Sequence, residues 1–352
     1  MKSIIHERPG VYSSYGASAA VWGGRAVRTI GVAAKSVSGT ANTVIRLTSY
    51  EMGVSAFGED AADAPGMSTM LKLLFQGGAS VVAAVKVDGE DYAAAFAALQ
   101  TVEDAQVIVC DSGALEVQQA LRASLESASA IRRERIAVVG MDGASTTELV
   151  ERAKALNSER MALVGPDGLD SAGKTLPGMF AAAAVAAAVA ITRDPAIPLN
   201  GTQLPGLGGV SAAYGDNEID LLVRGGVTPL EAVGGIVSPV RGITTRTTTG
   251  GAVDATWREL TTILIVDDVI PTIRQSLRSR FSQTKNTAQT RGAIRSQTIV
   301  ELENKLKAEI IDSYSDVAVS VYEDDPTVCL VEFSFSVAHG LNQIYLTAHI
   351  TI

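Results

Sequence analysis

Short, continuously apolar runs alternate with helix-like segments through the first half of the chain, and this pattern restricts the fold more than any other feature. A strand that is apolar on both sides is typical of a sheet buried between two layers of helices. The pattern therefore predicts an α/β domain with a mostly parallel sheet and flanking helices. The expected strands are Val81–Val87, Gln106–Cys110, Arg135–Val139 and Met161–Val164, and the expected helices are Met67–Gln76, Asp91–Leu99, Leu115–Ser129, Thr146–Leu156 and Met179–Ile191.

The alanine-rich stretch Met179–Ile191 is the most apolar part of the sequence, but it is too short to cross a bilayer. Its small side chains favour a buried helix that its neighbours approach closely. The first residues, MKSIIHERPGVY, lack the long apolar core of a signal peptide. We therefore expect synthesis in the cytoplasm and no insertion into a membrane.

A second region with a different pattern starts near Gly234. Its first part, Ile236–Thr248, is strand-like, and two helical segments follow. Alternating strands then come near the end of the chain, with a Glu-Asp-Asp-Pro turn between them. This arrangement predicts an α+β domain. The expected helices are about Thr261–Ser282 and Gly292–Asp312, and the expected strands are Val317–Tyr322 and Val328–Ala338.

Both ends of the chain have the character of extended arms. The first forty residues are rich in Gly, Ser and Ala, and the pair Pro9-Gly10 interrupts any regular element. At the other end, apolar and polar residues alternate up to the last position, which indicates a strand buried on one face. This strand either folds back as a hairpin or is donated to a neighbouring subunit. Its apolar residues are Ile344, Leu346, Ala348, Ile350 and Ile352.

Composition argues against several classes of function. A formal net charge of −9 is unlike that of a general nucleic-acid binder, which is usually basic. The cysteines Cys110 and Cys329 lie in apolar runs, as expected of reduced, buried thiols. The three histidines, His6, His339 and His349, show no metal-ligand spacing. We expect no metal, no cofactor and no histidine-based active site.

One motif favours an enzyme. The sequence GLDSAGKT matches the phosphate-binding loop pattern, with Gly168, Gly173, Lys174 and Thr175 at the defining positions. The acid of the ILIVD segment, Asp267, would be the metal-binding partner. However, Leu-Pro-Gly follows the Lys-Thr pair, and proline lacks an N–H group for phosphate. A nucleotide site is therefore the alternative hypothesis, and a surface loop that matches by chance is the simpler interpretation.

A concentrated basic segment lies between Asp268 and Glu301, where there is no acidic residue. It is either a solvated helical face or a surface for an acidic partner, for which complementary charge fixes the register. Its six cations are Arg274, Arg278, Arg280, Lys285, Arg291 and Arg295.

The chain resembles the contractile tail sheath proteins of phages and contractile bacteriocins. Each motif that carries the resemblance is short, but their order and spacing extend over nearly the whole chain. They are Pro9-Gly10-Val11-Tyr12, Gly31-Val32-Ala33-Ala34, Val240-Arg241-Gly242-Ile243-Thr244-Thr245, the helix that begins Ile265-Val266-Asp267-Asp268, and the final two strands.

The resemblance implies an arm over residues 1–25, an outer α/β domain over 26–235, an inner α+β domain over 236–340 and a donated strand over 341–352. It also implies a structural subunit, not an enzyme, that forms stacked hexameric rings around a tail tube and drives the tube through a target envelope on contraction. Expected partners are neighbouring sheath subunits, the tube protein, and baseplate and tail terminator proteins. In this family GLDSAGKT is not a motif, and part of the basic segment would face the tube.

Overall fold

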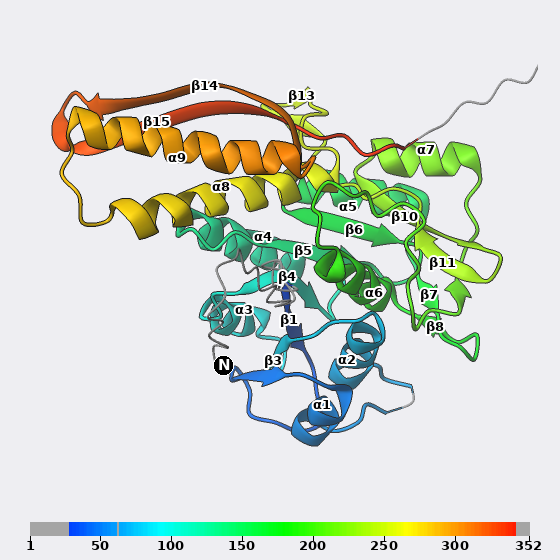
Figure 1. Cartoon of the computed structure of the whole chain (residues 1–352). Coiled ribbons are helices and arrows are strands. Elements are labelled where there is room, and N and C mark those ends of the chain that lie inside the picture. The colour runs from blue at the N-terminus through cyan, green and yellow to red at the C-terminus, as the bar shows by residue number, and fades with distance from the viewer. Residues whose placement is uncertain (1–27, 62, 343–352) are drawn as a thin grey trace, which may run out of the picture.

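A twisted eight-stranded sheet forms the centre of the molecule (Figure 1). The computed structural model describes residues 28–61 and 63–342. The strand order is β11-β10-β6-β5-β4-β1-β3-β2, and only the edge strands β2 and β11 are antiparallel to their neighbours. The predicted mostly parallel sheet is confirmed. The strands are β1 (Thr29–Ala34), β2 (Val44–Leu47), β3 (Val82–Lys86), β4 (Ala105–Cys110), β5 (Ile136–Gly140), β6 (Met161–Gly165), β10 (Val227–Val233) and β11 (Ile236–Pro239).

Helices cover both faces of this sheet because its strands carry apolar side chains on both sides. One hydrophobic core joins the sheet to α1 (Tyr50–Phe57), α2 (Met67–Gln76) and α6 (Gly178–Ile191). A second core lies on the opposite face. Its helices are α3 (Tyr92–Gln100), α4 (Leu115–Ala130), α5 (Thr146–Leu156) and α7 (Asp216–Arg224). The five predicted helices of this region are confirmed to within two residues at each end.

The alanine-rich helix α6 is buried along its length, as predicted, from Gly178 to Ala190. Its first turn lies against the end of β5. A Cβ atom added to Gly140 would come within 2.1 Å of the carbonyl carbon of Gly178, so only two glycines allow this approach.

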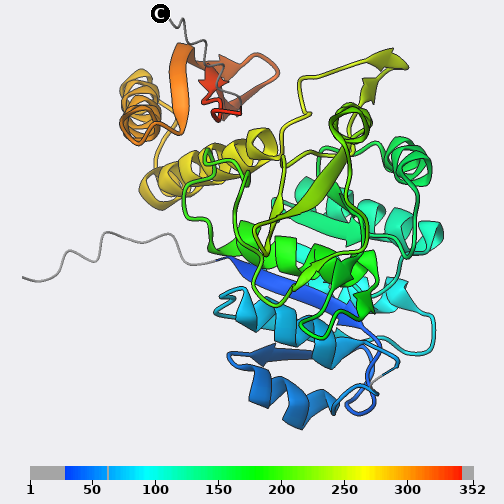
Figure 2. The same ribbon diagram turned by 90° about the vertical axis from the view of Figure 1, so that its right-hand side faces the viewer.

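The second region consists of two long helices and a long hairpin (Figure 1), and Figure 2 views it nearly end-on. Helix α8 (Leu260–Phe281) is followed by α9 (Ala288–Lys307), and the strands β14 (Ile311–Tyr322) and β15 (Asp325–Val337) pair antiparallel. The predicted helix end at Asp312 is wrong. Helix α9 ends at Lys307, Glu309 adopts a φ of +57°, and the strand begins six residues earlier than predicted.

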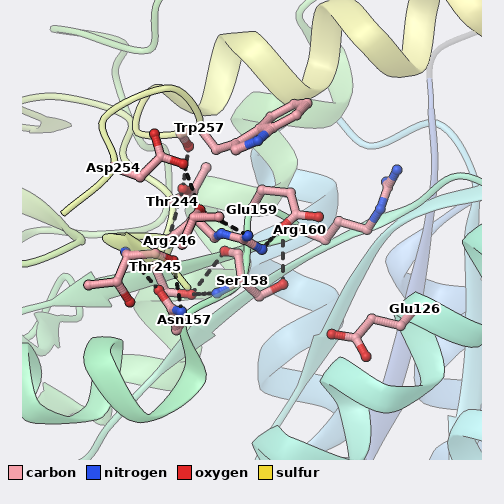
Figure 3. Close-up of polar contacts among 12 residues, drawn as sticks. Glu126, Asn157, Ser158, Glu159, Arg160, Thr244, Thr245, Arg246, Asp254 and Trp257 are labelled. Atoms are coloured by element: carbon pink, nitrogen blue, oxygen red, sulfur yellow. Dashed lines mark hydrogen bonds and ion pairs between the residues drawn. The ribbon is translucent and has the colours of Figure 1, made fainter. Parts of the chain in front are cut away.

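The predicted strand Ile236–Thr248 is also only partly correct, since β11 ends at Pro239. The following backbone is irregular and is hydrogen-bonded to the loop before β6, through the backbone of Ser158 and the side chain of Asn157 (Figure 3). Ser158 and Thr245 exchange two hydrogen bonds of 3.0 Å, and Asn157 Oδ1 accepts from the N–H groups of Thr247 and Thr248. Hydrogen bonds of the buried Thr245 hydroxyl therefore take the place of backbone bonds to a neighbouring strand here.

Helix α8 belongs to both regions. Its residues Leu260, Ile263 and Leu264 lie in the core with α6, whereas Val269 and Ile273 pack with α9 and the hairpin. Strand β11 follows the predicted domain boundary at residue 235, yet it pairs with β10 and so belongs to the large sheet. The two regions therefore share a continuous helix.

Candidate assembly surface

The β14–β15 hairpin has one face against the helices and one face outward. On the inner face, Phe333 and Phe335 stack with ring centroids 6.2 Å apart and pack, with Val337, into the cluster that contains Leu302 of α9. The alternating pattern read from the sequence is therefore a true one-sided strand pattern. Its outward residues include Glu332, Ser334 and Ser336, which are exposed.

The outer edges of this hairpin have no strand partner among the described residues, since the sheet order is simply β14-β15. The two edges differ. Between Ile311 and Ala318 the register gives β14 two extra residues relative to β15, and Asp316 has a φ of +55°. Bulges of this kind disturb an edge, so β15 presents the more regular row of backbone groups.

The predicted arm residues lie outside the described part of the chain. This holds for Pro9, Gly10, Val11 and Tyr12 at the start, because the description begins at Arg28. It holds equally for the terminal apolar residues, because Asn342 is the last residue that the structure describes. These residues are Ile344, Leu346, Ala348, Ile350 and Ile352.

The basic segment divides into two groups. Arg278, Arg280 and Lys285 are exposed at the end of α8 and in the loop after it. Arg274 and Arg291 are half-buried and Arg295 is exposed, and all three donate hydrogen bonds within the chain. Arg274 donates to Glu134 at 2.6 Å, Arg291 to Asn286 at 2.9 Å, and Arg295 to the carbonyl oxygen of Val317 at 2.8 Å.

Ion pairs that the sequence did not indicate fix α8 to its surroundings. Arg160 forms two hydrogen bonds with Asp267, at 2.8 and 3.1 Å, and Lys305 of α9 donates to the buried Asp268 at 2.7 Å. For Glu134, burial would raise the pKa, but the hydrogen bond and charge of Arg274 lower it below its ordinary value. Because these partners are up to 140 residues apart, no local pattern reveals them.

The nucleotide-loop hypothesis is not supported, because GLDSAGKT folds as a small hairpin. Gly168 and Leu169 form β7, which pairs with β8 (Thr175–Leu176) and with β9 (Gly209–Val210). Within the turn, Asp170 Oδ1 accepts from the N–H groups of Ala172 and Lys174, at 2.8 and 2.9 Å. The N–H of Gly173 donates to the carbonyl of Asp170. Backbone donors that would hold phosphate are thus used by the turn itself, and Asp267 is paired with Arg160 instead.

Residues 28–61 and 63–342 contain no group of three or more His, Cys, Asp or Glu side chains that is arranged to hold a metal ion. No helix in the same part of the chain has the length and apolar character needed to cross a membrane. Both cysteines are free thiols, but only Cys110 is fully buried, whereas Cys329 on β15 is half-buried.

Family comparison matches most of the chain to two adjoining models. Residues 85–245 match the phage tail sheath protein central domain, and residues 252–351 match the phage tail sheath C-terminal domain. A tail sheath protein of Bacillus phage SP01 is 30% identical over 181 residues. That alignment covers 51% of this chain but only 30% of the SP01 protein.

Solved structures with the same fold include sheath proteins. A sheath tail protein from Desulfitobacterium hafniense matches with a TM-score of 0.71 at 12% identity, over 93% of this chain and 100% of that one. The contracted helical sheath of the anti-feeding prophage matches with a TM-score of 0.72 at 16% identity, over 98% and 99%. At these identities the likeness concerns the fold, whereas the two family models together include most of the sequence. The chain belongs to the phage tail sheath protein family.

Proposed function

We propose that this chain is the structural subunit of a contractile tail sheath that polymerises as stacked hexameric rings around a tail tube. On contraction the sheath drives the tube through a target cell envelope. Family membership supports the structural role, and the fold shared with contracted sheaths supports the contractile one. The partners proposed are neighbouring copies of this chain, the tube protein, and baseplate and terminator proteins. The particle would be a phage tail or a tail-like injection system.

The observation that carries this proposal is the β14–β15 hairpin, whose two strands, 12 and 13 residues long, form a two-stranded sheet in the described chain. Strands of this length in a soluble protein invite pairing with another chain unless something covers their edges. The sequence offers two candidate strands, the N-terminal arm and the alternating C-terminal segment. We assign them to the hairpin edges of neighbouring subunits.

Strand donation would stabilise contacts between subunits through backbone hydrogen bonds and apolar burial. A strand of about ten residues adds several backbone hydrogen bonds, each contributing roughly 0.5–1.5 kcal/mol net. The apolar side chains on its inner face add about 0.8 kcal/mol per buried CH₂ group, less the entropy lost in ordering the arm. A flexible arm also keeps subunits connected while their rigid bodies rotate.

Electron microscopy and sedimentation of the purified chain test the donated strand. The double variant Leu346→Asp/Ile350→Asp places charges on its apolar face, and we expect it to stay soluble under conditions in which the wild type forms sedimenting tubes. The matched control, Thr347→Asp/Thr351→Asp, adds the same charges to the polar face of the same strand and should still polymerise. Polymers of normal length from the first variant would refute strand donation.

The tube-facing surface is assigned to Arg278, Arg280 and Lys285, the exposed cations at the end of α8 and in the loop after it. Arg274, Arg291 and Arg295 support this surface from within the chain through their hydrogen bonds. Co-assembly with the tube protein tests the assignment. Arg278→Glu/Arg280→Glu should weaken sheath formation on tubes, whereas Lys72→Glu/Lys154→Glu, at exposed positions of the α/β region, should not. Equal assembly of both variants on tubes would refute the assignment of the basic surface to the interface with the tube.

A further inference from the structure

The chain leaves the hairpin along a short connection, residues 338–342, that contacts the α/β region (Figure 1). The N–H of Ala338 still donates to the carbonyl of Ile310, at 3.2 Å. Beyond it, Gly340 lies against the ring of Pro198, so closely that a Cβ at Gly340 would be 2.9 Å from its Cγ. At Asn342, the side-chain Oδ1 accepts from Asn200 Nδ2 at 2.7 Å.

The surface that receives this connection is itself firmly held. Leu199, between the two contact residues, is 4% exposed and belongs to the core under α6. The next N–H, that of Gly201, donates to the carbonyl of Pro239 at the end of β11. Residues 198–200 are therefore fixed to the large sheet. Asn200 Oδ1 is buried and has no hydrogen-bond partner within the described residues, so it remains available to a donor from elsewhere.

We infer that Pro198 and Asn200 form an anchor that sets the point and direction from which the C-terminal strand leaves each subunit. This inference rests on the proposed donation of that strand. Without the anchor, the strand would start from a free tether and search a larger volume before it met a neighbour, which lowers its effective concentration at the acceptor edge. Through the anchor, the α/β region determines where the link between subunits begins.

The hydrogen bond is tested with two variants of the full-length chain. Asn342→Leu removes the acceptor, and Asn342→Asp keeps an acceptor oxygen at the same place. We expect Asn342→Leu to raise the critical concentration for polymerisation by about fivefold, the factor that one ordinary hydrogen bond represents, and Asn342→Asp to stay near wild type. Hydrogen exchange of residues 338–342 should accelerate in Asn342→Leu and remain unchanged in α8.

The close contact gives a second, independent test. Gly340→Ala should displace the connection because its Cβ meets the ring of Pro198, and Pro198→Ala should restore assembly in the double variant because it removes the two nearest ring atoms. Wild-type exchange at 338–342 together with wild-type critical concentrations in both Asn342→Leu and Gly340→Ala would overturn the anchor. If Leu346→Asp/Ile350→Asp polymerises normally, strand donation fails instead, whereas the exchange data still report on the contact.

Discussion

Arg160, immediately before β6, and Asp267 of α8 form a two-pronged ion pair that joins the large sheet to the helix shared with the second region. Their side chains are 11% and 14% exposed, so water screens the pair only weakly. Together with the apolar contacts of Leu260 and Ile263, this pair makes the first half of α8 part of the α/β region. A force that acts on α8 is therefore transmitted to the sheet.

Asp267→Asn should lower the free energy of unfolding by about 3 kcal/mol, because the buried guanidinium of Arg160 would lose the carboxylate to which it is hydrogen-bonded. Replacing both partners, as in Arg160→Met/Asp267→Leu, should restore most of this loss. Urea denaturation measures both effects. Glu126→Gln, which breaks an exposed pair with Arg122, is the control and should cost less than about 0.5 kcal/mol. A loss in Asp267→Asn no greater than in this control would contradict the role assigned to the pair.

Arg135 should be as important for stability as a core residue, although it is charged. It is 2% exposed, and its two terminal nitrogens donate to the carbonyls of Leu99, in the last turn of α3, and Val102, just after it, at 3.1 and 2.9 Å. Arg135→Met removes the donor to the Val102 carbonyl, whereas the Leu99 carbonyl still accepts from the N–H of Val102. The variant should cost about 2 kcal/mol in thermal or urea unfolding. The neighbouring, exposed Arg132→Met should change stability by less than about 0.5 kcal/mol. Similar losses of stability in the two variants would mean that the removed charge, and not the buried position, determines the effect.

Alanine substitution should change the stability of the protein in opposite directions at Gly140 and at Gly292. At Gly140 the new Cβ would collide with the backbone of Gly178, and at least about 3 kcal/mol of destabilisation or failure to fold is expected. At Gly292, within α9, nothing lies within 4 Å of the added atom, and alanine should stabilise the protein by about 0.5–1 kcal/mol. Calorimetric melting temperatures of the two variants give the comparison. A stable Gly140→Ala protein would mean that α6 can move away from β5.

The elements that the sequence predicted well are those in which the polarity and size of the side chains match their burial. The strands of the large sheet are apolar on both faces, and α6 is alanine-rich because neighbouring elements approach it closely. The one-sided alternation of β15 likewise indicated its inward residues, Phe333 and Phe335. For such elements periodicity and composition carry the same information as the structure.

The features that the sequence did not reveal depended mainly on contacts that only the folded chain creates. After Pro239 the β-branched residues suggested a strand, but Thr244 and Thr245 are buried because their hydroxyl groups bond to residues elsewhere in the chain. Likewise, half of the basic segment found partners within the same molecule, among them Glu134 for Arg274. GLDSAGKT matched a short pattern whose geometry the side chain of Asp170 excludes. The first two outcomes leave no local signal in the sequence, whereas the proline that follows the Lys-Thr pair already argued against a phosphate loop.

Acidification should weaken the ion pair between Arg46 of the edge strand β2 and Asp104, over a pH range that follows from the pKa of Asp104. Asp104 accepts from both terminal nitrogens of Arg46, at 2.8 and 2.6 Å, and from Thr29 at 2.9 Å. The hydrogen bond from Arg46 lowers the pKa of Asp104 from 3.8 to about 2. A carboxylate with a lowered pKa stabilises the folded state above pH 3.8, and this contribution disappears as the pH falls from about 4 to about 2.

The coupling between the two side chains can be followed with a double-mutant cycle of Arg46→Met and Asp104→Asn. Because the pair is about half exposed, the coupling free energy at pH 7 should be below about 1 kcal/mol. We expect it to be constant between pH 7 and pH 5, to decrease below pH 4 and to approach zero near pH 2. Urea unfolding of the four proteins at each pH measures it. A coupling that falls to zero already above pH 5 would exclude Asp104 as the titrating partner of Arg46.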